Sequence, residues 1–87
     1  MKHLERLQGA LSMEGIDSVQ VFFEGHYSIA VECGHIAQNI IVKPHYSMFT
    51  VYTFDIYGSV DVIENYSKEG VVNLAVQRAM TPKHKGE

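Results

Sequence analysis

Residues 17–33 are DSVQVFFEGHYSIAVEC, and this stretch decides the fold. Apolar and polar residues alternate on both sides of Gly25-His26, which is typical of two antiparallel strands joined by a tight turn. Valine, isoleucine and aromatic residues, which favour strands, supply most of the apolar positions. The stretch therefore predicts a β-hairpin.

The register of this hairpin follows from the side chains that each possible turn brings together. A three-residue turn over 24–26 would place Phe23 opposite Tyr27 and Val21 opposite Ile29. This register collects the apolar side chains of both strands on one face, and burial of that face favours it. We therefore expect the three-residue turn.

The same alternation continues to residue 56 and predicts further strands over 36–43 and 47–56. A two-residue turn at Gly34-His35 would pair Ile29 with Ile40 across the second hairpin. Short connections centred on glycine indicate antiparallel neighbours in a meander. Residues 60–63 fit either a fifth strand or the first turn of a helix, because four residues are too few for periodicity to decide.

Helical patterns flank these strands. Over residues 2–14, Leu4, Leu7 and Leu11 recur at three- and four-residue spacing and form one apolar stripe. Gly15 then occupies the position where a left-handed residue ends a helix, and Ile16 is placed to contact Leu11 in a Schellman motif. The pattern predicts a helix that stops at Gly15.

A second helix is predicted from a cap at Ser67 to about Met80. The sequence thus predicts an α+β fold, an antiparallel four- to five-stranded meander sheet with an N-terminal and a C-terminal helix packed on one face, in α-β-β-β-β-α order. Residues 1–80 form one domain, and 81–87 form a flexible tail. The sequence leaves open which sheet face the C-terminal helix covers.

Composition and charge narrow the function classes. The chain has 87 residues, 46% of them hydrophobic, and one cysteine, which favours the reducing cytoplasm. Charged residues at the N-terminus argue against a signal peptide, and no apolar run is long enough to cross a membrane.

Residues 14–64 carry seven carboxylates against Lys43 alone, a net charge of −6. An acidic body repels phosphate, so nucleic acid is an unlikely ligand and a basic partner surface fits better.

The sequence contains no motif that fixes a reaction, and we expect neither an enzyme nor a cofactor. The candidate metal ligands are His26, Cys33, His35 and His45. The first and third of these cap opposite ends of a seven-residue strand, about 20 Å apart. Cys33 alternates with core residues, and a buried cysteine is usually inert. We therefore expect no metal site and no catalytic thiol.

A local repeat places two histidine–tyrosine pairs at strand ends: Gly25-His26-Tyr27-Ser28 recurs as Pro44-His45-Tyr46-Ser47. Both pairs, His26-Tyr27 and His45-Tyr46, are expected at the same end of the sheet. They would form the polar rim of a binding surface. A small enzyme that uses this rim is an alternative reading.

The reverse face of the sheet is the main candidate for binding. If the helices cover the face that holds Val21, Ile29 and Tyr52, an aromatic surface with an acidic border remains. Such a surface predicts a protein partner or a homodimer. A C-terminal helix lying over this face is the alternative. The expected partner-binding residues are Phe22, Glu24, Glu32, Ile41, Phe49 and Val51.

The last helix resembles part of the double-stranded-RNA-binding domain. Ser67-Lys68-Glu69 is similar to that family's helix start, and Ala75 and Ala79 to its alanine face. The resemblance implies RNA binding as an alternative function, although the family's further lysines are absent.

In size and acidity the chain is similar to small phage and mobile-element proteins, including anti-CRISPR inhibitors of host machinery. The expected function is a small protein-binding inhibitor or adaptor.

Overall fold

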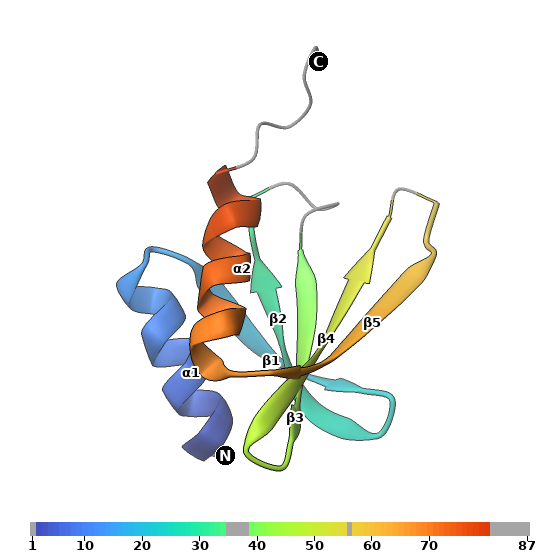
Figure 1. Cartoon of the computed structure of the whole chain (residues 1–87), viewed down its shortest axis with the longest axis horizontal. Helices are drawn as coiled ribbons and strands as arrows, with labels where there is room; N and C mark the ends of the chain where they lie inside the picture. Colours follow the sequence, from blue (N-terminus) through green and yellow to red (C-terminus); the bar gives the residue numbers. More distant parts are fainter. Residues whose placement is uncertain (1, 35–38, 56, 81–87) are drawn as a thin grey trace.

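The computed structural model describes residues 2–34, 39–55 and 57–80. It confirms the α+β meander and has five strands. Sheet order follows chain order, and all neighbours are antiparallel. Both helices lie side by side on one face of the twisted sheet (Figure 1). The elements are α1 (Lys2–Met13), β1 (Asp17–Phe23), β2 (His26–Glu32), β3 (Ile40–His45), β4 (Met48–Phe54), β5 (Val60–Tyr66) and α2 (Lys68–Met80).

The predicted helix ends are confirmed. Gly15 has a φ of 78° at the end of α1, and the backbone N–H of Ile16 donates to the carbonyl of Leu11 at 3.0 Å, as a Schellman motif requires. At the start of α2, the backbone N–H of Gly70 donates to the hydroxyl of Ser67 at 3.0 Å. Neither described helix is long and apolar enough to cross a membrane. The predicted tail over 81–87 lies outside the described residues.

The β1–β2 turn differs from the prediction. It contains two residues, Glu24 and Gly25, and both have positive φ angles, of 51° and 82°. Two left-handed residues define the primed turn that matches the twist of a hairpin. Phe22 therefore lies opposite Tyr27, and the predicted pairing of Phe23 with Tyr27 is wrong. Because the register moves by one residue, the side chains of β1 point to the opposite faces from those expected.

The pairing of the remaining strands also corrects two expectations. Ile29 pairs with Val42 rather than with Ile40, so the connection between β2 and β3 is longer than a two-residue turn. The predicted turn residue His35 lies outside the described residues. Residues 60–63 belong to strand β5, which settles the choice between strand and helix.

The main core lies between the helices and the sheet face that they cover. On β4, Val51 lies opposite Val42 and Phe49 lies opposite Pro44. The side chains of Val51 and Phe49 therefore point toward the helices. Phe49 and Val51 are fully buried, and the prediction that they lie on the reverse face is wrong. The core contains Leu4, Leu7, Leu11, Ile16, Ile29, Val31, Cys33, Ile40, Val42, Phe49, Val51, Val71 and Ala75.

The far face, which is the sheet face turned away from the helices, forms a second and smaller cluster. The ring of Phe23 on β1 lies 5.0 Å from that of Tyr52 and 6.5 Å from that of Phe54, both on β4. Two strands separate β1 from β4, so these contacts require the sheet to curl over its far face. Ser28 and Thr50 are buried there although no helix covers them. The prediction that Val21 and Tyr52 face the helices is therefore wrong.

Different burial predicts different costs for truncating two phenylalanines on the helix side of the sheet. Phe49→Ala removes a fully buried ring and should destabilise the protein by about 3–5 kcal/mol. Phe22→Ala removes a mostly exposed ring and should cost less than about 1 kcal/mol. Urea denaturation followed by circular dichroism measures both values. Equal losses would contradict the exposure of Phe22 and the burial of Phe49.

Candidate functional site at the hairpin tips

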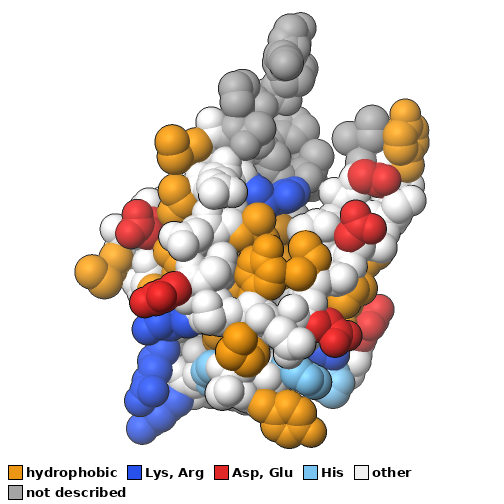
Figure 2. Space-filling view, in the orientation of Figure 1, with side chains coloured by type: hydrophobic (Ala, Val, Ile, Leu, Met, Phe, Trp, Pro, Cys, Tyr) orange, Lys and Arg blue, Asp and Glu red, His pale blue; other side chains and the backbone are white. Residues whose placement is uncertain are grey.

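One end of the sheet gathers six residues that the sequence singled out. Strand β2 begins and strand β3 ends there, so the β1–β2 and β3–β4 turns lie at the same end (Figure 1). Figure 2 shows histidine and hydrophobic side chains together at this lower end of the molecule. We call this the hairpin-tip surface: Phe22, Glu24, His26, Tyr27, His45 and Tyr46.

Phe22 and Tyr27 form an exposed aromatic pair on this surface. They are direct cross-strand partners, and their rings meet edge to face at 5.2 Å and 72°. Phe22 is 65% exposed and Tyr27 is 64% exposed, so neither helix covers them. Exposing large aromatic rings to water is unfavourable in free energy. Exposed aromatic pairs are therefore characteristic of surfaces that bind other proteins.

The β3–β4 turn adds a second aromatic group. Tyr46 has a φ of 57° and is 92% exposed at the turn. Its ring lies 4.9 Å from that of His45, which is itself exposed. His26 is also exposed and lies on the far face, opposite Phe23. The structure thus places both histidine–tyrosine pairs at one end of the sheet.

His3 supports this end from α1, and sequence reasoning did not identify it. Its ring stacks on Phe49 at 4.3 Å and 13°, and its Nε2 lies 3.4 Å from the carbonyl oxygen of Met48. These contacts join residues 45 and 46 positions apart, so no local pattern could have revealed them. The stacked ring holds the start of α1 against the first residues of β4.

Four of the residues expected to bind a partner lie elsewhere. Glu32 is exposed at the opposite end of β2, directly across from Asp17. Ile41 is half-buried in the middle of the far face beside Tyr52. Phe49 and Val51 are in the core. The predicted reverse-face surface is therefore divided among the core, the far face and the hairpin tips.

The opposite end of the sheet has a hollow of about 310 Å³ beside Cys33, with Asp17 and Glu32 in its lining. The thiol is fully buried. Burial raises the pKa of Cys33 above its usual value, and the charge of Arg78 only partly opposes this effect. A protonated, enclosed thiol is a poor nucleophile. The hollow therefore has no accessible reactive group at Cys33.

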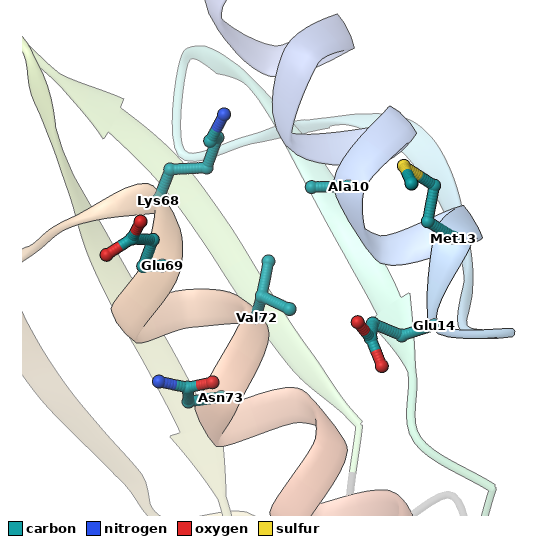
Figure 3. A pocket seen from close by; sticks show the side chains of 7 residues that line it. All are labelled: Ala10, Met13, Glu14, Lys68, Glu69, Val72 and Asn73. Atoms are coloured by element: carbon teal, nitrogen blue, oxygen red, sulfur yellow. The ribbon is translucent and has the colours of Figure 1, made fainter.

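A shallow groove of about 210 Å³ separates the two helices (Figure 3). Ala10 from α1 and Val72 from α2 provide its apolar floor, and charged side chains including Glu14 and Lys68 surround it. Such a groove can receive one apolar side chain.

Within the described ranges, no three His, Cys, Asp or Glu side chains are close enough to hold a metal ion together. The candidate ligand His35 lies outside these ranges. Comparison with known protein-family models, with curated protein sequences and with solved structures finds no match. Function is therefore inferred from the surface of this chain itself.

The state of Cys33 predicts slow reaction with thiol reagents. In the native protein at pH 7–8, iodoacetamide should label Cys33 at least about 100-fold more slowly than in urea, because the buried thiol stays protonated and shielded. Raising the pH toward the raised pKa should speed native labelling, because the thiolate fraction grows, and the rate should level off above that pKa. Mass spectrometry measures the rates. Rapid native labelling at pH 7 would show an accessible thiolate.

Proposed function

We propose that this protein is a small, non-enzymatic protein-binding domain that contacts its partner through the hairpin-tip surface. The observation that carries the proposal is the edge-to-face pair of Phe22 and Tyr27, each about two-thirds exposed. Aromatic residues dominate the binding energy of protein interfaces when they enter pockets on the partner. An exposed pair of this kind is therefore the strongest anchor on the described surface.

The position of the pair on paired strands favours affinity. Phe22 and Tyr27 lie within a continuous ladder that joins Asp17–Phe23 to His26–Glu32. A side chain on a regular ladder loses little conformational freedom on binding, which reduces the entropic cost of association. Tyrosine adds a hydroxyl that can hydrogen-bond at the rim of a contact.

The chemistry of the surface defines the partner. Glu24 is its only acidic residue, and the rest of the surface is aromatic or histidine. We infer a partner with apolar pockets rather than a strongly charged site. A domain of this kind acts by occupying its partner, as an inhibitor or adaptor of the class that phages encode. The net charge of −6 over residues 14–64 disfavours nucleic acid, and a free thiol suits the cytoplasm.

Paired substitutions test the proposal. Phe22→Ala with Tyr27→Ala should weaken binding to the partner by at least about 30-fold, because the loss of a single interface anchor already costs about 2 kcal/mol or more. The partner is first captured from lysate of the source cells on immobilised wild-type protein, then purified and titrated by calorimetry. A second copy of this chain is included as a candidate by measuring mass in solution.

Tyr57→Ala is the matched control. Tyr57 is also an exposed tyrosine, at 85%, but it lies in the β4–β5 turn at the opposite end of the sheet. It should leave affinity unchanged, and all variants should keep the wild-type circular dichroism. Unchanged binding by the double variant, or loss with Tyr57→Ala alone, would contradict the proposed surface.

A further inference from the structure

The open sheet has two edge strands, β1 and β5, and the helix α1 contacts the first. Gln8 on α1 donates from Nε2 to the carbonyl of Ser18 at 3.3 Å and to its hydroxyl at 3.0 Å. Gln20 in turn donates to Oε1 of Gln8 at 3.3 Å. The carbonyl of Ser18 is a backbone group that another strand would need, and Gln8 occupies it. The helix therefore blocks the edge of β1 at Ser18.

The other edge is open. Strand β5 pairs with β4 on one side only, and every residue from Val60 to Asn65 is exposed. Val60 is 48% exposed and Val62 is 51% exposed, and pairing with Phe54 and Tyr52 places both on the far face. An edge strand with exposed apolar side chains is a template for a further strand.

The straight part of this edge is short. Pairing of β5 with β4 is regular from Val60 to Ile63, and the register then shifts before Tyr66, where Asn65 has a φ of 66°. A bulge of this kind ends the row of evenly spaced backbone groups. The edge can therefore pair with about four residues of another chain, over roughly 13 Å.

The charge beside this edge identifies the kind of strand that fits. Residues 55–69 carry four carboxylates against one lysine, a net charge of −3. Figure 2 shows acidic side chains along the side of the molecule where β5 lies. Two copies of this edge would repel each other, whereas a basic segment would be attracted. A basic partner is therefore favoured over a second copy.

We propose that β5 accepts, as a sixth strand, an extended protein segment in which apolar and basic residues alternate. Its apolar side chains lie beside Val60 and Val62 on the far face. Its basic side chains lie beside Asp61, which pairing with Thr53 places on the helix side. Main-chain hydrogen bonds supply affinity, and this alternation supplies specificity. The site lies apart from the hairpin-tip surface and does not depend on it.

Synthetic peptides test the proposal on the full chain. A seven-residue peptide of alternating valine and lysine is titrated while backbone amides are followed by NMR and hydrogen exchange. Binding should shift and protect the amides of 60–63. N-methylation of alternate peptide amides on the pairing side should abolish binding, because it removes main-chain donors. A valine–glutamate peptide of equal length should bind at least about five-fold more weakly.

Charge reversal on the protein provides the complementary test. Asp61→Lys should weaken binding of the lysine peptide about five-fold and strengthen binding of the glutamate peptide. Glu14→Lys changes the net charge by the same amount at the exposed end of α1. It should change the affinity for each peptide by less than about two-fold. Phe22→Ala with Tyr27→Ala should leave peptide binding intact, so failure here is distinct from failure of the hairpin-tip surface.

Several results would overturn the proposal. These are equal binding of both peptides, binding that survives N-methylation, and amide shifts centred outside β5. A dimer in sedimentation whose β5 amides are already protected without peptide would show that a second copy occupies this edge instead.

Discussion

The two-residue turn at Glu24-Gly25 is the constraint on which the rest of the structure depends. With both residues in the left-handed region, the turn sets the register of β1 against β2 and so decides which side chains of β1 face the helices. Ser18, Gln20 and Phe22 point to the helix side. Val19, Val21 and Phe23 point to the far face.

The direction in which each β1 side chain points explains three further features of the structure. On the helix side β1 presents Ser18 and Gln20, and Gln8 on α1 bonds to both. On the far side the apolar residues of β1 need cover, and the sheet supplies it by curling until Phe23 meets Tyr52. Phe22, at the same turn, is left exposed beside Tyr27. One turn therefore produces the polar contact between α1 and β1, a second cluster and an aromatic tip.

The sequence predicted the elements that depend on local chemistry. The Schellman ending at Gly15, the serine cap at Ser67 and the strand order all follow from residues close together in the chain. The register of the first hairpin did not follow, because glutamate carries no preference for the left-handed region that Glu24 adopts. Strand β4 is apolar on both faces, since Phe49 and Val51 alternate with Tyr52 and Phe54. Periodicity could not choose its core face.

The candidate site was predicted only in part, for the same reason. The histidine–tyrosine repeat indicated the correct end of the sheet, because strand direction follows from chain order. Phe22 is exposed and Phe49 is buried because of the strand registers and the position of α1. The ring of His3 on α1 stabilises that position by stacking on Phe49, which lies 46 residues later in the chain. Exposure of an aromatic side chain is a tertiary property, and no single strand encodes it.

The hairpin-tip surface rests on the register of the first hairpin, and nuclear Overhauser contacts between aromatic rings test that register directly. The structure predicts contacts of the Phe22 ring with Tyr27 and of the Phe23 ring with Tyr52. Contacts of Phe23 with Tyr27, together with Val21 and Ile29, would show a three-residue turn. That result would move Phe22 to the far face and contradict the account.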